Sequence, residues 1–307
     1  MFTFYGRFGM DFNNFDYEKL TKTLSALVKK YAFASVFSCG KSVLGRDILC
    51  IRIGKGKRKI FLNGAHHSLE WITSSLLASY ACDYAAALKD ETEFCGENIL
   101  KLYQSATFYI VPMVNPDGVD FVINGIKKNS PAYGVVKGAL GGRNVKKVWQ
   151  ANANGVDLNH NYDASFAEGK KMEREMGIFG ANYTRYSGEE PFSEPETQAV
   201  KALFEKKKFD ISVAFHSQGE EIYYDFAGNT KYKRTAEALA KVSGYTAAKP
   251  DGIASVTGFK DWVIDKFSLP AFTVEAGKGQ NPLPFSQFEK IRKDNYALIT
   301  ECAFLRL

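Results

Sequence analysis

The segment NGAHHSLEW, residues 63–71, decides how the rest of the chain can be interpreted. It follows a short apolar run at residues 59–63 and precedes a long, alanine-rich apolar stretch at residues 71–88, so it is predicted to join a strand to a helix. His67 and Glu70 are three residues apart, and on a first helical turn their side chains project from the same side. An imidazole and a carboxylate placed in this way can bind one zinc ion (Zn2+). The alternative for an isolated pair of this kind is a solvated helix position.

A third zinc ligand is expected at the end of another strand. His216 directly follows the apolar run at residues 211–215 and fits that place. Two histidines and one glutamate leave a coordination position open for water, which is typical of catalytic rather than structural zinc sites. The alternative for His216 is a buried histidine with ordinary hydrogen bonds. His66 is interpreted as a non-ligand, because its neighbour His67 is the residue with the right spacing to Glu70.

Two acidic residues could support chemistry at such a site. Glu275 ends the apolar run at residues 270–275, which would deliver its carboxylate to a sheet edge as a general base; the alternative is a surface glutamate beyond a strand end. Asp157 lies in the polar segment GVDLNHN, residues 155–161. It could accept a hydrogen bond from the second ring nitrogen of His67 and so fix the ring. The alternative for Asp157 is an Asx-rich turn.

Apolar patterns of the strand and helix types alternate along the chain. This alternation predicts an α/β fold with a central sheet and helices on both faces. Residues 115–145, rich in glycine, lysine and asparagine, are predicted to form a long surface loop. Strands are predicted at residues 35–39, 47–53, 59–63, 107–114, 211–215 and 270–275, and helices at residues 17–31, 71–88 and 194–205.

The composition favours one ordinary globular catalytic domain over residues 1–307. Hydrophobic residues make up 45% and charged residues 24% of the chain, and the formal charge is only +6. The basic residues are spread along the chain, so no nucleic-acid surface is expected. No run reaches the ~20 apolar residues of a membrane span, and no signal peptide pattern is seen. Five widely spaced cysteines predict free thiols, and a cytoplasmic location is expected.

Taken in order, seven segments resemble the zinc carboxypeptidase family. The resemblance outweighs the alternative interpretations of His216 and Glu275, because seven ordered matches are far more specific than one motif. It implies a single-domain fold with a mixed central sheet flanked by helices. The segments are GKSVLGRDILCIRIG (40–54), NGAHHSLEW (63–71), VNPDGVD (114–120), GVDLNHN (155–161), FSEPETQAV (192–200), AFHSQ (214–218) and FTVEAGKG (272–279).

The resemblance also implies roles for individual residues. Zinc would be bound by His67, Glu70 and His216. Glu275 would act as general base and then general acid. Asp157 would support the zinc site from behind His67, and Asn159 would contact a substrate carboxylate.

Three positions depart from the family pattern and bear on the substrate. His160 stands where carboxypeptidases carry the arginine that clamps a terminal carboxylate, and histidine is a weaker clamp. Gln150 stands where typical members carry an arginine that stabilises the oxyanion. Lys260 lies where the family builds its specificity pocket, which suggests an acidic group on the substrate; a surface lysine is an equally good interpretation.

These departures resemble the bacterial γ-D-glutamyl-L-diamino acid peptidases of the same family, as does the run GKGQNPLP at residues 277–284. The resemblance implies a zinc-dependent peptidase that cleaves the bond between γ-D-glutamate and diaminopimelate or lysine in cell-wall muropeptides. One alternative is a carboxypeptidase that removes C-terminal residues from ordinary peptides. Another is a non-catalytic muropeptide-binding protein. The sequence predicts no oligomeric state.

Overall fold

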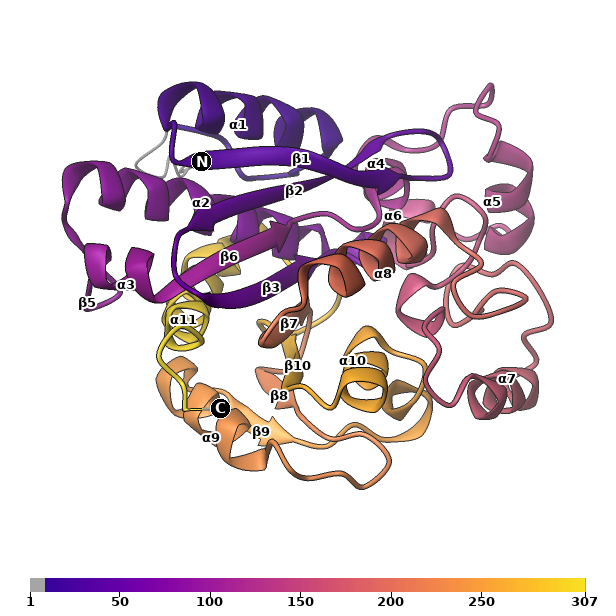
Figure 1. Ribbon diagram of the computed structural model, residues 1–307. Helices are drawn as coiled ribbons and strands as arrows, with labels where there is room; N and C mark the ends of the chain where they lie inside the picture. The colour runs from indigo at the N-terminus through magenta and orange to yellow at the C-terminus, as the bar shows by residue number, and fades with distance from the viewer. Residues whose placement is uncertain (1–8, 307) are drawn as a thin grey trace.

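A computed structural model describes residues 9–306, which form helices around one eight-stranded sheet (Figure 1). The strand order is β1-β2-β6-β3-β7-β10-β8-β9. The central strands β6, β3, β7 and β10 run parallel, and β1 and β2 pair antiparallel with their neighbours. β8 pairs antiparallel with β10 and parallel with β9, so the expected mixed sheet is confirmed. The strands are β1 Ala34–Lys41, β2 Asp47–Gly54, β3 Arg58–Gly64, β6 Ala106–Val111, β7 Ile211–His216, β8 Glu221–Tyr223, β9 Thr246–Ala248 and β10 Ala271–Glu275.

The central parallel strands are buried on both faces. Every residue of β6 and β7 is buried, and both strands are almost continuously apolar in sequence. Parallel strands have this pattern because helices cover both sides of the sheet. These strands can therefore be predicted from continuous apolar runs, although their sequences do not alternate between polar and apolar residues.

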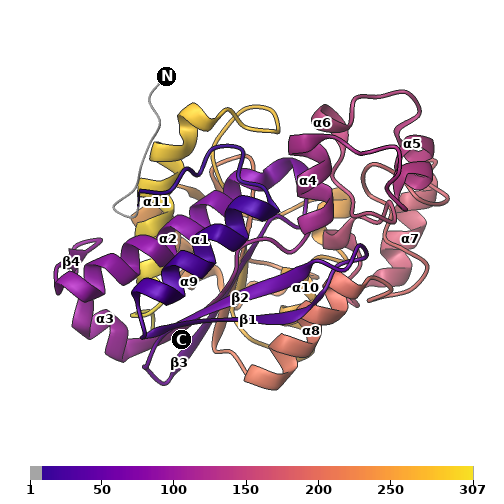
Figure 2. The same cartoon turned by 90° about the horizontal axis from the view of Figure 1, so that it is seen from above.

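The helices form a layer on each side of the sheet. Seen from above, α1 and α2 lie on one side of the sheet and α8 lies on the other (Figure 2). The helices are α1 Tyr17–Lys30, α2 Trp71–Asp90, α3 Ile99–Ser105, α4 Pro116–Asn124, α5 Tyr133–Leu140, α6 Val145–Val148, α7 Phe166–Glu175, α8 Pro195–Lys207, α9 Lys233–Ser243, α10 Phe259–Phe267 and α11 Phe288–Glu301. A short hairpin, β4 Glu93–Phe94 and β5 Glu97–Asn98, follows α2.

The prediction of a long loop at residues 115–145 is wrong, because this stretch contains α4 and α5 and reaches the start of α6. Asn115 begins α4 by accepting a hydrogen bond from the backbone N–H of Gly118 at 2.9 Å, and Pro116 occupies the first turn. Val136 and Leu140 bury one side of α5. The sequence pattern does not predict the short helices α4 and α5, because glycines and lysines interrupt their apolar spacing. The strand predicted at residues 107–114 also ends earlier, at Val111.

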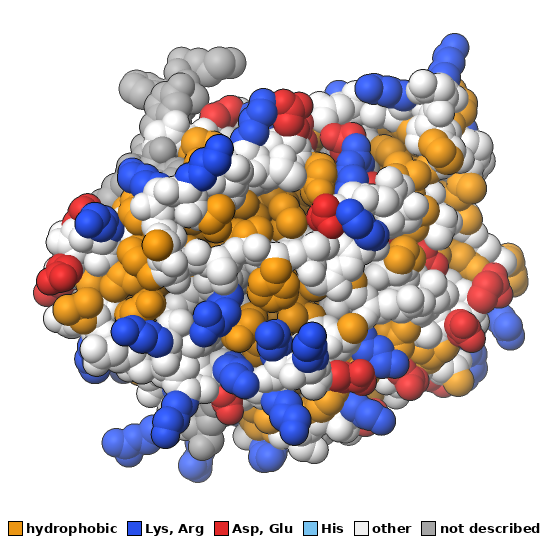
Figure 3. Space-filling model, turned by 45° about the horizontal axis from the view of Figure 1, so that its top comes forward, with side chains coloured by type: hydrophobic (Ala, Val, Ile, Leu, Met, Phe, Trp, Pro, Cys, Tyr) orange, Lys and Arg blue, Asp and Glu red, His pale blue; other side chains and the backbone are white. Residues whose placement is uncertain are grey.

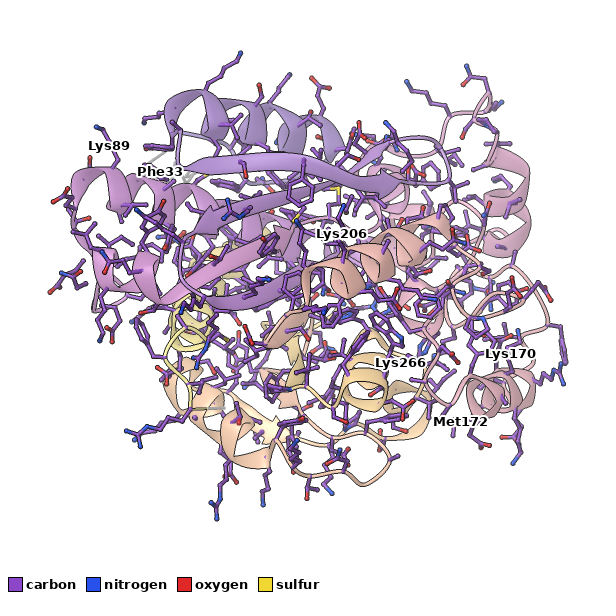
Figure 4. All side chains as sticks on the ribbon, viewed as in Figure 1. Phe33, Lys89, Lys170, Met172, Lys206 and Lys266 are labelled. Carbon is purple, nitrogen blue, oxygen red and sulfur yellow. The ribbon has the colours of Figure 1, made fainter. Side chains whose placement is uncertain are left out.

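The charged surface matches the mild net charge. Basic side chains are spread over the visible face and lie among acidic and apolar ones (Figure 3). Lys89, Lys170, Lys206 and Lys266 come from four different helices (Figure 4). None of the helices in residues 9–306 is long and apolar enough to cross a membrane. All five cysteines are free, as expected, while the compartment stays a prediction.

Candidate metal centre and active site

The site is built where the parallel strands β7 and β10 end. His216 is the last residue of β7, and it lies opposite Glu275, the last residue of β10. On the far side of Glu275, the antiparallel strand β8 begins with Glu221 directly opposite. Carboxyl ends of parallel strands are the usual place for ligand sites in α/β sheets. The sheet register therefore creates a row of three ionisable side chains at this edge.

The three predicted metal ligands converge next to this row. His67 precedes the short 3-10 helix η1, Ser68–Glu70, and Glu70 ends it, so the turn after β3 carries both side chains. His67 Nδ1 lies 2.9 Å from Glu70 Oε1, and His216 Nδ1 lies 3.0 Å from Glu70 Oε2. The two Nδ1 atoms are 3.3 Å apart.

These residues fit a zinc ion. Tetrahedral zinc with Zn–N bonds of 2.0–2.1 Å places two ligand nitrogens about 3.4 Å apart, close to the separation of the two Nδ1 atoms. Two imidazoles and a carboxylate are the donor set of catalytic zinc sites. Within residues 9–306, these are also the residues whose potential ligand atoms all lie within 4.8 Å of one another.

Electrostatics at the site follow from buried charges of opposite sign. Burial alone would lower the pKa of His67, but the carboxylates of Glu70 and Asp157 raise it well above its usual range. Burial alone would raise the pKa of Glu70, but His67 and His216 hold it at about 2. Glu70 is therefore ionised at neutral pH, as a metal-ligating carboxylate must be.

Asp157 lies behind the ring of His67. Its Oδ1 atom is 3.0 Å from His67 Nε2, and its Oδ2 accepts a hydrogen bond from the backbone N–H of Arg185 at 2.8 Å. Burial opposes ionisation of Asp157, yet the nearby charge of His67 keeps its pKa well below the usual range. A carboxylate at Nε2 turns Nδ1 toward the metal position, which is the role expected for Asp157.

Glu275 is the carboxylate beside the metal ligands. Burial, followed by the negative charge of Glu70, raises its pKa well above the usual range. A bound metal cation lowers such a pKa again, because it reverses the sign of the local charge. The position of Glu275 beside the metal ligands is the one expected for a general base.

His66 does not join the metal ligands. It is fully buried, and its Nε2 atom lies 2.8 Å from the hydroxyl of Tyr162. Asn115, in the Asn-Pro-Asp-Gly segment, stabilises the turn that carries His66 and His67. Its amide nitrogen donates hydrogen bonds to the backbone oxygens of His66 and Ala151 and to Ser68 Oγ. The interpretation of His66 as a non-ligand agrees with this placement.

Asn159 and His160 lie in the short 3-10 helix η2, Leu158–His160. Asn159 Oδ1 accepts a hydrogen bond from the backbone N–H of Phe259 at 3.2 Å. His160 is almost completely buried, and its Nδ1 lies 3.0 Å from Thr257 Oγ1. Burial lowers the pKa of His160, so the ring is neutral at pH 7 and supplies no positive clamp for a terminal carboxylate.

Gln150 and Lys260 both have partners within the protein. Gln150 Oε1 accepts a hydrogen bond from Thr184 Oγ1, and its amide nitrogen has no recorded partner among residues 9–306. Lys260 is buried, and its ammonium donates to the backbone oxygen of Asp225 and to Asp261 Oδ1. The interpretation of Lys260 as a surface lysine is therefore wrong. An acidic substrate group at Lys260 would have to share the ammonium with Asp261.

Two further residues at the site were not assigned from the sequence. Asn281 Nδ2 donates to the backbone oxygen of Ser217 at 2.6 Å and lies 3.4 Å from Glu70 Oε1. In the sequence, its segment GKGQNPLP indicates only a resemblance to the family and no role for Asn281. Glu221 lies opposite Glu275, and its position became visible only from the strand register, because β8 is too short for a sequence pattern.

Comparisons with known proteins agree with this geometry. The model of the zinc carboxypeptidase family matches residues 20–298. Gamma-D-glutamyl-L-diamino acid endopeptidase 1 of Lysinibacillus sphaericus is 35% identical over 92% of this chain and 70% of its own length. An uncharacterised protein of Bacillus subtilis (strain 168) is 33% identical over 94% of this chain and 77% of its own length.

Solved structures share the fold at low sequence identity. Bovine thrombin-activatable fibrinolysis inhibitor, in complex with tick carboxypeptidase inhibitor, superimposes with a TM-score of 0.71 at 16% identity. The match covers 94% of this chain and 96% of that one. Because the family model spans nearly the whole chain and a relative exceeds 30% identity over most of both lengths, this chain belongs to the zinc carboxypeptidase family of metallopeptidases.

Proposed function

We propose that this chain is a zinc-dependent peptidase that hydrolyses the amide bond between γ-D-glutamate and a diamino acid in cell-wall muropeptides. The observation that carries the proposal is the convergence of His67, Glu70 and His216 beside Glu275. The substrate class is supported by the relative named a gamma-D-glutamyl-L-diamino acid endopeptidase, with which this chain shares 35% identity.

In the proposed mechanism, Glu275 moves the proton. His67, Glu70 and His216 would hold the zinc ion, which would supply the positive charge that polarises a scissile carbonyl and acidifies water. Glu275 removes a proton from the attacking water and returns it to the leaving amine. Asp157 keeps the ring of His67 oriented throughout the cycle, because a buried carboxylate 3.0 Å from Nε2 restricts ring rotation.

The remaining polar groups are proposed as substrate contacts. The amide nitrogens of Asn159 and Gln150 can donate to the substrate, since their side-chain oxygens are already used within the protein. Asn159 would hold a substrate carboxylate, and Gln150 would donate to the developing oxyanion. Lys260, paired with Asp261, and His160, paired with Thr257, would shape the pocket around them.

The alternative of an ordinary carboxypeptidase needs a cation for the terminal carboxylate. At the position in question His160 is buried and neutral at pH 7, which disfavours this alternative. The test is to incubate the zinc-loaded protein with L-Ala-γ-D-Glu-diaminopimelate and with a blocked C-terminal dipeptide. We expect a higher kcat/KM for the muropeptide. Preference for the dipeptide would favour the carboxypeptidase, and binding of the muropeptide without cleavage would favour a non-catalytic binding protein.

A further inference from the structure

Glu221 places a second carboxylate directly beside Glu275. The two residues are opposite each other in the antiparallel pair of β8 and β10. Directly opposite residues project from the same face, with Cβ atoms about 4.5–5.5 Å apart. Backbone hydrogen bonds fix this register, because Glu220 N donates to Glu275 O at 2.7 Å and Gly219 N donates to Gly277 O at 2.8 Å. The carboxylate of Glu221 is thus held at the site by the sheet itself.

Glu221 has no cationic partner in the described part of the chain. Its Oε2 atom accepts a hydrogen bond from the hydroxyl of Tyr223 at 2.9 Å, and no ion pair with lysine, arginine or histidine is recorded within residues 9–306. The preceding residue differs, since Glu220 pairs with Lys278 and Lys290 at 2.9 and 2.8 Å. Two carboxylates opposite each other on a strand pair repel when both are ionised. A cation supplied from outside the protein would relieve this repulsion.

The space beside the two carboxylates is kept free of a side chain by Gly219. A Cβ atom at this position would lie 3.4 Å from Glu221 Oε2 and 3.5 Å from the Cβ of Glu275. Any larger side chain would therefore compete with a ligand for the space between them. Burial and the hydrogen bond to Glu221 raise the pKa of Tyr223, so its hydroxyl keeps the proton that it donates in this hydrogen bond.

We propose that Glu221 determines specificity by binding the side-chain ammonium group of the substrate's diamino acid. The inference rests on the proposed function and adds the residue that distinguishes a diamino acid from other amino acids. Neighbouring strands are about 4.8 Å apart, so Glu221 lies roughly 10 Å across the sheet from His216. A lysine-type side chain extends about 6 Å from its Cα, and the glutamate side chain bridges the remaining distance.

Two peptides that differ only in this ammonium group test the proposal. They are L-Ala-γ-D-Glu-L-lysine and L-Ala-γ-D-Glu-L-norleucine, which has nearly the same shape without the amino group. We expect the wild-type protein to prefer the lysine peptide, with most of the difference in KM. Glu221→Gln should lower kcat/KM for the lysine peptide at least tenfold and change that for the norleucine peptide less than twofold.

Two further variants separate recognition from folding. Glu220→Gln removes the neighbouring carboxylate, which pairs with lysines, and should leave the lysine-to-norleucine ratio unchanged. Glu221→Asp keeps the charge and should retain part of the preference. Equal losses on both peptides in Glu221→Gln, or a wild-type protein without preference, would overturn the inference while the proposed function stands. A wild-type protein that cleaves neither peptide would overturn the proposed function and the inference together.

Discussion

Replacing Asp157 with asparagine tests how the protein prepares His67 for the metal. The substitution keeps the shape of the side chain but removes its charge. Asparagine has a single oxygen, so it can accept from His67 Nε2 or from the backbone N–H of Arg185, but not from both, and its amino group then faces the other donor. Charge-assisted hydrogen bonds contribute about 1.5–3 kcal/mol, which corresponds to a 10–100-fold weaker metal affinity.

The assay is a zinc competition titration with a chromophoric chelator, performed on metal-free protein. Asp157→Asn is expected to raise the zinc Kd 10–100-fold, and the effect should be independent of any substrate. Asp163→Asn serves as the matched control, because Asp163 is exposed and lies only six residues after Asp157. Thermal melting in chelator checks that both variants are folded. A zinc Kd within threefold of the wild-type value in folded Asp157→Asn protein would refute the proposed role of Asp157.

Three other predictions concern stability. Zinc at a thousandfold excess over its Kd should stabilise the fold by about 4 kcal/mol, so adding chelator should lower the Tm measured by calorimetry by about 8 °C; an unchanged Tm would argue against a metal at this site. A Cβ at Gly118 would lie 2.0 Å from Ser68 Oγ, so Gly118→Ala should cost about 1–3 kcal/mol in urea unfolding, whereas Gly134→Ala, with open space in α5, should not destabilise the protein. Burial raises the pKa of Glu196 to about 7, so the folded state binds a proton that the unfolded chain releases near pH 4.5, and stability falls as pH rises between these values. The free energy of unfolding is measured against pH, in chelator, for the wild-type protein and for Glu196→Gln. The variant should lack about 3 kcal/mol of the decline seen in the wild-type protein. Parallel pH profiles of the two proteins would contradict the raised pKa of Glu196.

The parts of the fold that the sequence could predict are those with strong local signals. The buried strands β3, β7 and β10 appear as continuous apolar runs, and α1 and α2 have long apolar patterns bounded by caps or turns. The helices α4 and α5 lack such a signal, because glycines break their apolar spacing and the two helices are only nine and eight residues long. β8 and β9 have only three residues each, so their existence depends on pairing with β10 and with each other.

The same distinction applies to the site. His67 and Glu70 are close in sequence, and strand ends located His216 and Glu275, so these four residues could be found from local patterns and family resemblance. The partners of Lys260 could not be found in this way, because one of them is a backbone oxygen 35 residues away. The position of Glu221 beside Glu275 depends on the register between two strands. Residues that face each other across two strands cannot be identified until the register of the strands is known.

The central claim is that Glu275 carries out hydrolysis of the γ-D-glutamyl bond at a zinc site. Mass spectrometry of the products from L-Ala-γ-D-Glu-diaminopimelate tests it most directly, with zinc-loaded wild-type protein and zinc-loaded Glu275→Gln compared at equal zinc content. We predict that the wild-type protein releases L-Ala-D-Glu and free diaminopimelate. The variant should retain zinc and lose activity 10²–10⁴-fold. Wild-type turnover by Glu275→Gln, or cleavage at another bond, would contradict the claim.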